Sequence, residues 1–276
     1  MKIVDCFIFY NELEMLLYRL EILNEVVDYF VIIESTHTFD GKEKSLYFAE
    51  NAQLYEKYRD KIIVVTTDDM PFKYPNIDVL LGHQWLNERQ QRNHIDTGLK
   101  FLSSKLENGL QDEDIILITD LDEIPDPQTL RKVKNKNIRV TVNILDMYMY
   151  YYNLNTRHEV KWLKAKILTY KAYKTYACAN ITCDQLRLKH DYKIIPKGGW
   201  HLSYFGDAQF IKNKIEHFSH QELNVDEYTN PEKINGRIKK CADLYDRDLP
   251  ISKIPVSQND YLPPLYRERL SNFIAF

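Results

Sequence analysis

The chain has 276 residues, of which 44% are hydrophobic and 28% charged, with a formal net charge of −3 and a pI near 6.3. This length suits one or two globular domains, and the composition is that of an ordinary globular protein. The slightly acidic charge argues against a nucleic-acid-binding surface, and no run approaches the roughly 20 apolar residues that a membrane-spanning helix needs. We therefore expect a soluble, cytoplasmic protein without a transmembrane segment.

The four cysteines do not have the spacing of a zinc site. Only Cys178 and Cys183 lie close together in the sequence, and a disulfide between them stays open. A reducing compartment is the simplest interpretation. Asp5 interrupts the apolar run at the start of the chain, which argues against a signal peptide.

The first half of the chain alternates strand and helix patterns, which indicates an α/β fold with a mostly parallel sheet. Apolar residues at one-face helical spacing predict a helix over 13–23, and similar spacing predicts a long helix over 84–106. A shorter helix is expected over 49–58. Strands are predicted over 3–9, 29–33, 61–66 and 115–118.

The second half is less regular. Extended segments are predicted over 140–153 and 164–173, and a glycine-bounded aromatic segment covers 197–206. Helices are expected over 208–218 and 231–246. No repeat or linker interrupts the chain, so we expect a single domain over 1–250. An irregular tail packed on it is expected over 251–276.

The segment from Ile115 to Pro125 is the most informative of the chain, because a buried apolar strand runs directly into three acids. In an extended segment, Asp120 and Asp122 would point to the same side. Two carboxylates at the carboxyl end of a strand suit Mg²⁺ or Mn²⁺, which can also hold a diphosphate. This is the Asp-x-Asp arrangement of nucleotide-sugar glycosyltransferases. The alternative is a strand end with solvated acids, followed by a helix that begins near Asp126.

The sequence Gly198-Gly199-Trp200-His201 is a second informative cluster. His201 offers a neutral nitrogen ligand that Mn²⁺ accepts readily, and Trp200 offers a face for stacking. The alternative is a tight turn with Trp200 in the core and His201 bonded to the backbone. A Tyr-rich stretch, 148–152, could stack an acceptor sugar, although a half-buried strand explains it equally well.

Several polar residues are placed where a nucleotide would lie. Arg89 and Arg92 are neighbours on one face of the predicted long helix, and two guanidinium groups suit a diphosphate. An ordinary solvated helix surface would explain them as well. Four further candidates follow the first two strands: Asn11, Glu12, Glu34 and Ser35.

With these residues in place, the chain resembles glycosyltransferase family 17, the β-1,4-N-acetylglucosaminyltransferases that add the bisecting residue to N-glycans. The matching features are Asn11-Glu12, Tyr29–Ser35, Ile118–Pro125 and Gly199–Ser203, and they span roughly residues 1 to 250. The resemblance implies a GT-A fold, a UDP-sugar donor such as UDP-GlcNAc, a glycan acceptor, a divalent metal ion, and inversion at the anomeric carbon. The animal enzymes carry an N-terminal membrane anchor, which we do not expect in this chain, so a bacterial or viral glycan is an equally reasonable acceptor.

The residues and the resemblance together predict a metal-dependent, inverting glycosyltransferase. Asp122 would bind the Mn²⁺ or Mg²⁺ ion, Asp120 would help through the metal or the ribose, and His201 would be a third ligand. Trp200 is assigned with Asp120 to the nucleotide-sugar site. Three acids are candidates for the base that deprotonates the acceptor: Asp207, Glu216 and Glu123.

Two other functions compete with this interpretation. Phosphatases of the haloacid dehalogenase type also place Asp-x-Asp after a strand, but near the N-terminus and with Thr or Val where this chain has Ile124. A non-catalytic glycan-binding module would suit a chain with twenty Tyr and twelve Phe, yet it would not need acids at a strand end.

Overall fold

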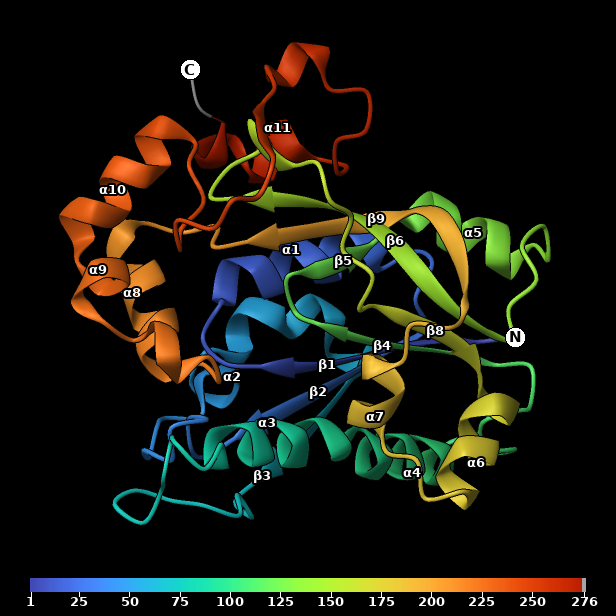
Figure 1. Cartoon of the computed structure of the whole chain (residues 1–276). Helices are drawn as coiled ribbons and strands as arrows, with labels where there is room; N and C mark the ends of the chain where they lie inside the picture. The colour runs from blue at the N-terminus through green and yellow to red at the C-terminus, as the bar shows by residue number, and fades with distance from the viewer. Residues whose placement is uncertain (275–276) are drawn as a thin grey trace.

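Four parallel strands, β1 (Ile3–Phe9), β2 (Tyr29–Ser35), β3 (Ile62–Thr67) and β4 (Ile115–Asp120), form the N-terminal half of the sheet. They belong to a computed structural model that describes residues 1–274 (Figure 1). Their order is β3-β2-β1-β4, so that β1 lies between β2 and β4. The parallel arrangement predicted for the first half is confirmed.

Helices cover both faces of this parallel half. One face packs against α1 (Leu13–Leu23), the 3-10 helix η1 (Ala52–Lys61) and α5 (Pro127–Lys134). The opposite face packs against α4 (Ile95–Lys105), α6 (Tyr170–Cys178) and α7 (Cys183–Leu188). β1, β2 and β4 are therefore buried on both sides, which explains their long apolar runs, whereas the edge strand β3 is partly exposed.

The alternation of side chains along β1 divides the core in two. Ile3 and Phe7 join the cluster under α1, whereas Val4 and Cys6 join the cluster under α4. Helix α4 packs closely on the sheet at Gly98, because a Cβ atom there would clash with the side chain of a β2 residue.

The second half of the sheet is mostly antiparallel. β8 (Lys166–Thr169) lies between β4 and β6 (Val142–Tyr151) and is antiparallel to both. The long β9 (Lys193–Ser203) runs parallel to β6 and pairs with the short β5 (Glu123–Pro125). β7 (Thr156–His158) and β10 (Ile251–Lys253) extend the other edge. The ten-stranded sheet is therefore mixed.

Some predicted elements differ in extent. The predicted helix 84–106 is two helices, α3 (His83–Asn93) and α4, because the chain tightens at His94, whose N–H bonds Gln91 at i−3. The predicted helix 49–58 is the short α2 (Tyr47–Glu50) followed by η1. The strand predicted over 164–173 stops at Thr169, whose hydroxyl caps α6.

A third group of helices stands beside the ends of β6 and β9 (Figure 1). It comprises α8 (Ala208–His217), η2 (Gln221–Leu223), α9 (Asp226–Thr229) and α10 (Pro231–Lys240). Helix α10 ends at Lys240, six residues before the predicted end, and the next residue, Cys241, has positive φ. Its own apolar cluster contains Ile211, Ile234 and the tyrosines at the strand ends.

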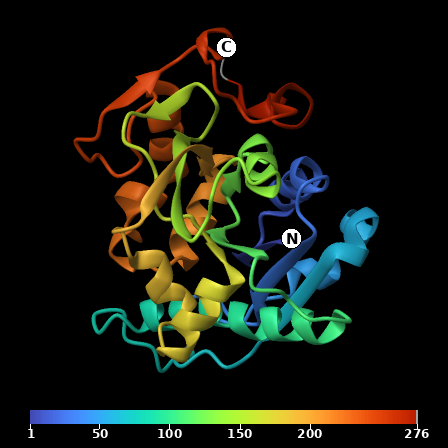
Figure 2. The same ribbon diagram turned by 90° about the vertical axis from the view of Figure 1, so that its right-hand side faces the viewer.

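The C-terminal segment runs across the top of the molecule in both ribbon views (Figures 1 and 2). After β10 it contains η3 (Val256–Gln258), α11 (Tyr266–Arg269) and η4 (Ser271–Phe273). Tyr261 and Leu270 are buried in the main core. Within residues 1–274, no helix has the length and apolar character needed to cross a membrane.

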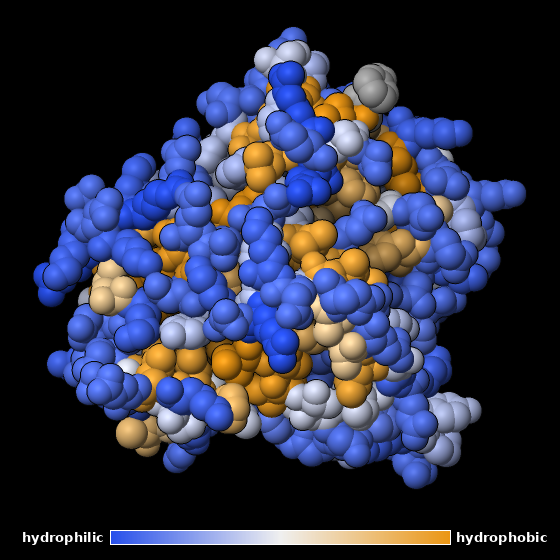
Figure 3. Space-filling model, turned by 180° about the vertical axis from the view of Figure 1, so that it is seen from behind, coloured by the Kyte–Doolittle hydropathy of each residue, from blue (hydrophilic) through white to orange (hydrophobic). Residues whose placement is uncertain are grey.

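Polar and charged side chains cover most of the rear surface, and apolar side chains show between them in its lower and central parts (Figure 3). The exposed apolar residues of the chain come from different elements, among them Val64 on β3, Leu80 in the loop before α3, and Phe101 on α4. The polar residues that are candidates for catalysis or ligand binding gather elsewhere, at the carboxyl ends of the parallel strands.

Candidate active site

A cleft of about 880 Å³ lies at the carboxyl ends of β1, β2 and β4. Residues at or after the ends of these strands line it, including Tyr10, Thr38 and Asp120, together with side chains from α3, α7 and α8. Ligands of open α/β sheets bind at this edge, and the volume is in the range of small-molecule sites. The cleft is therefore the candidate active site.

The Asp-x-Asp segment forms a turn rather than a continuing strand. β4 ends at Asp120, Leu121 and Asp122 make the turn, and β5 begins at Glu123. The expectation that both carboxylates point to one side assumed an uninterrupted strand. In the structure the two carboxylates contact different cations, although both line the cleft.

Arg19 of α1 holds this turn from below. Its Nη1 donates to the backbone oxygens of Asp120, Leu121 and Glu123 at 2.9, 2.8 and 2.8 Å. The rest of the guanidinium pairs with the fully buried carboxylate of Asp5 on β1, at 2.7 and 2.8 Å. The conformation of the turn is thus fixed by a buried charge pair, not by the turn sequence alone.

Asp120 is held by two buried guanidinium groups, those of Arg92 on α3 and Arg187 on α7. Arg187 also donates to the carboxylate of Glu123, with Nη1 to Oε2 at 2.6 Å. Burial raises the pKa of Asp120, but the neighbouring Arg187 and Arg92 lower it more, so that the pKa lies below its usual value. Asp120 is therefore a carboxylate locked in a charged network.

The sequence analysis missed α7, which carries Arg187 into the site. The helix starts with a capping box in which Thr182 and Gln185 bond each other's backbone N–H groups, a pattern visible in the sequence. The buried ammonium of Lys166 donates to the backbone oxygen of Arg187 at 2.9 Å and so anchors the end of the helix. One turn before Arg187, Asp184 also lines the cleft and accepts from Arg92 at 3.2 Å.

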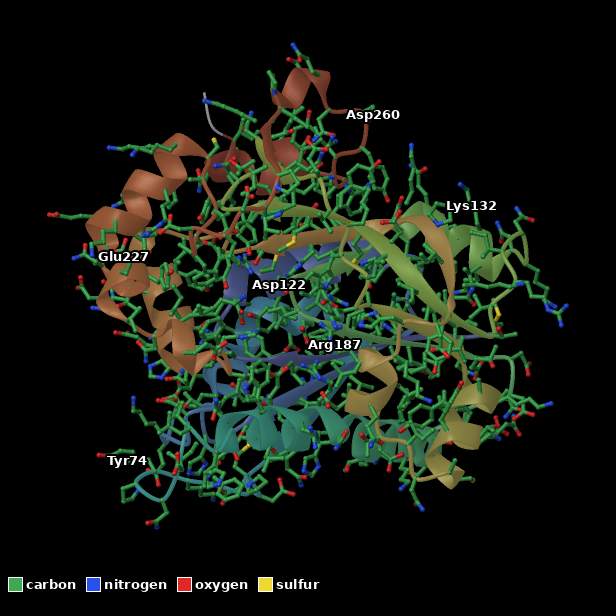
Figure 4. All side chains as sticks on the ribbon, in the orientation of Figure 1. Tyr74, Asp122, Lys132, Arg187, Glu227 and Asp260 are labelled. Carbon is green, nitrogen blue, oxygen red and sulfur yellow. The ribbon has the colours of Figure 1, made fainter. Side chains whose placement is uncertain are left out.

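Asp122 has a different environment, made of one ammonium and one imidazole. Lys214 of α8 lies 2.9 Å from one carboxylate oxygen, and His201 Nε2 lies 3.4 Å from the other. Lys214 also approaches Glu12, at 3.3 Å. Burial raises the pKa of Asp122, but Lys214 and His201 together hold it well below its usual range. Asp122 and Arg187 both lie near the centre of the front view (Figure 4).

Two of the three predicted metal ligands fit a divalent ion. Asp122 and His201 face each other across 3.4 Å, and the ammonium of Lys214 shows that a cation is favoured beside Asp122. Asp120 does not complete the set, because its oxygens are engaged by guanidinium groups. Among residues 1–274, no three His, Cys, Asp or Glu side chains are grouped as a metal site.

Other predicted site residues lie outside the cleft lining. Trp200 is buried in the core beneath it and donates from Nε1 to the backbone oxygen of Tyr261 at 3.0 Å. Arg89, in contrast to Arg92, has a side chain that is 48% exposed and approaches Asp184 at 3.4 Å.

The three acids predicted as bases have structural partners. Asp207 caps α8 by accepting from a backbone N–H of that helix, and Glu216 lies 3.8 Å from Lys212 on the same helix. Glu123 is fully buried against Arg187 and the indole N–H of Trp162. None of the three lines the cleft.

The predicted residues after β1 and at the end of β2 bind mainly to the loops and helix around the cleft. The Asn11 amide donates to Asn213 of α8 at 3.1 Å, and Ser35 Oγ accepts from the backbone of His37 at 3.0 Å. Glu34 is buried and lies 3.3 Å from the ammonium of Lys44. Of the four residues predicted here, Glu12 lines the cleft itself.

Aromatic side chains form the end of the cleft away from β2. The Trp162 ring lies 4.5 Å from the His201 ring, and Tyr204 and Tyr245 share a hydrogen bond of 2.6 Å. All four residues line the cleft, as does Tyr151. Within the Tyr-rich stretch 148–152, Tyr151 is the one tyrosine among the lining residues.

The family model described as Glycosyltransferase family 17 matches residues 1–251 of the 276. No curated protein matches the chain. The matched region contains every cleft residue described above.

Proposed function

We propose that this chain, which belongs to glycosyltransferase family 17, transfers N-acetylglucosamine or a related sugar from a UDP-sugar to a glycan acceptor, with inversion at the anomeric carbon. Family membership makes the chain a glycosyltransferase, with a sugar donor and an acceptor. It also favours transfer over the phosphatase and the non-catalytic glycan-binding module. The proposal further includes a bound divalent metal ion and a GT-A architecture.

The observation that carries the proposal is the set of cations around the Asp-x-Asp turn. Arg92, Arg187 and Lys214 all line the cleft, and each is paired with a carboxylate. Guanidinium groups bind phosphate oxygens in a fork, and a lysine can move its ammonium between anions. A donor diphosphate placed at this point would meet three positive groups supplied by three helices.

The proposed metal ion, Mn²⁺ or Mg²⁺, would be held by Asp122 and His201. When bound, it would act as a Lewis acid that neutralises the departing diphosphate. Lys214 competes for the same carboxylate, and Glu12, 3.3 Å from the ammonium, gives it a second anionic partner. The chain itself binds the donor, fixes the turn through Arg19, and supplies the acceptor's surroundings through its aromatic end.

Calorimetry of UDP binding tests this assignment. Mn²⁺ should tighten UDP binding in the unmodified protein, and Asp122→Ala and His201→Ala should abolish most of that gain while leaving the melting temperature close to that of the parent. Asp112→Ala is the matched control, because Asp112 is an exposed acid just before β4 that pairs with Lys174. Equal UDP affinity in chelator and in Mn²⁺ would remove the metal from the proposal, and normal Mn²⁺ affinity of His201→Ala would remove that ligand.

A further inference from the structure

An aspartate and a histidine form a second polar pair in the cleft, on the side of β2. His217, the last residue of α8, places Nδ1 3.2 Å from Oδ1 of Asp40, which belongs to the loop after β2. His217 lines the cleft, and its side chain is 20% exposed. The pair thus bridges a loop of the parallel half and a helix of the C-terminal half.

Asp40 is fixed and charged. The Thr38 hydroxyl donates to it at 2.5 Å, and the Lys42 ammonium lies 2.8 Å away. Burial raises the pKa of Asp40, but His217, Lys42 and Thr38 lower it to about 2. A carboxylate at Nδ1 keeps the proton on that nitrogen, which leaves Nε2 of a neutral imidazole as a proton acceptor.

The groups that face this pair come from three parts of the chain. The Tyr10 ring, after β1, lies 6.2 Å from the His217 ring, and Glu12 follows it. Lys44, from the loop after β2, lies 5.7 Å from the Tyr10 ring. Lys214 precedes His217 by one helical turn on α8. Within residues 1–274, no hydrogen bond engages His217 Nε2, although Nδ1 is held.

Resting on the proposed function, we propose that His217 is the general base of the transfer and that Asp40 positions it. The acceptor oxygen forms a bond to the anomeric carbon of the donor sugar. The bond from that carbon to the diphosphate oxygen breaks, and its electron pair leaves with the diphosphate. The acceptor's proton passes to His217 Nε2. An imidazole whose far nitrogen donates to a carboxylate is well suited to this task.

The other acids of the cleft are less suited to this role. Glu12 pairs with Lys214, Asp184 with Arg92, and Glu88 with Arg92 and the Ser219 hydroxyl. These carboxylates are therefore already engaged by cations of the chain. Glu222, which also lines the cleft, contacts His220 at 2.7 Å.

The test uses the full chain with UDP-GlcNAc, measuring UDP release with water as the acceptor, together with UDP binding in Mn²⁺. His217→Gln should keep the melting temperature and the UDP affinity, and it should lower kcat on the order of 100-fold or more, with loss of the acidic limb of the pH profile. Added imidazole should restore part of the activity of His217→Ala. Asp40→Asn should lower kcat more than it raises KM.

An aspartate–histidine pair outside the cleft provides the control. His94 Nε2 lies 2.8 Å from Asp69, and neither residue lines the cleft, so His94→Gln should leave kcat and UDP binding unchanged. Weaker UDP binding of His217→Gln with unchanged kcat would make His217 a nucleotide-binding residue and overturn the assignment. If the unmodified protein binds UDP and releases UDP from UDP-GlcNAc, and His217→Gln is fully active, only the assignment of the base is overturned. If the unmodified protein neither binds UDP nor releases it, the proposed function fails as well.

Discussion

The two aspartates of the Asp-x-Asp turn are two residues apart and have opposite surroundings. Asp120 lies between two buried guanidinium groups that also hold Glu123 and Asp184. Asp122 faces a half-buried lysine and a histidine. Arginine keeps its charge and its planar geometry, whereas a lysine can swing away and a neutral histidine can bind a metal ion. Asp120 is thus held by arginines, and we propose that Asp122 is the acid that can exchange its cation.

The largest expected effect is a difference in unfolding free energy between variants at the arginines around Asp120 and variants at the lysine beside Asp122. Arg187→Met leaves Glu123 as a fully buried charge without its guanidinium, and breaking such a pair costs about 3–5 kcal/mol of unfolding free energy. Lys214→Met leaves the buried Asp122 carboxylate with His201 as its remaining neighbour, and we expect a smaller loss of about 2 kcal/mol. Urea unfolding of both variants measures the contrast. Equal losses of unfolding free energy would mean that the surroundings of Asp122 are as rigidly held as those of Asp120.

The same contrast explains what could be predicted from the sequence. The parallel strands and α1 follow from local apolar patterns, and the Asp-x-Asp turn lies at the strand end where the sequence places it. The ion pairs join residues far apart in the chain, such as Asp120 with Arg187 or Asp122 with Lys214, and no local spacing encodes them. Trp200 and Arg89 are predicted to bind the nucleotide sugar because of their place in the sequence, but neither lines the cleft.

The next prediction concerns competition for Asp122. If Lys214 occupies the position of a cation, Lys214→Ala should bind Mn²⁺ about tenfold more tightly than the parent in the absence of UDP, equivalent to about 1.4 kcal/mol. Arg92→Ala should leave Mn²⁺ affinity unchanged and weaken UDP binding instead. Titration calorimetry with each ligand measures both. A Lys214→Ala variant with weaker Mn²⁺ binding would contradict the exchange.

Acid pH should reveal the contribution of a third carboxylate, that of Asp40. The pKa of Asp40 is lowered to about 2 in the folded chain, against its usual value near 4, so its ionised form stabilises the fold above pH 4. This contribution is lost as the pH falls from about 4 to 2. Asp40→Asn should therefore lose about 1–2 kcal/mol less over that interval than the parent, measured by urea unfolding at each pH. Parallel curves for the two proteins would show that Asp40 makes no such contribution.

The smallest effect is expected from Arg89, in contrast to Arg92 of the same helix. Arg92→Ala should weaken UDP binding at least about tenfold, whereas Arg89→Ala should change it less than about twofold, because the Arg89 side chain is half exposed and Arg92 is buried in the cleft wall. Isothermal titration of UDP compares them directly. Similar losses for both would restore the expectation that the two form one diphosphate clamp.

The hydrogen bonds of Arg19 have a consequence for transferring this site to another protein. The carbonyls that it binds lie 101 to 104 residues further along the chain, so the conformation of the turn depends mostly on residues outside the turn. A graft of residues 120–123 onto a foreign strand would carry the acids without their scaffold. The smallest portable unit must also include β1 with Asp5 and α1 with Arg19, in their native packing.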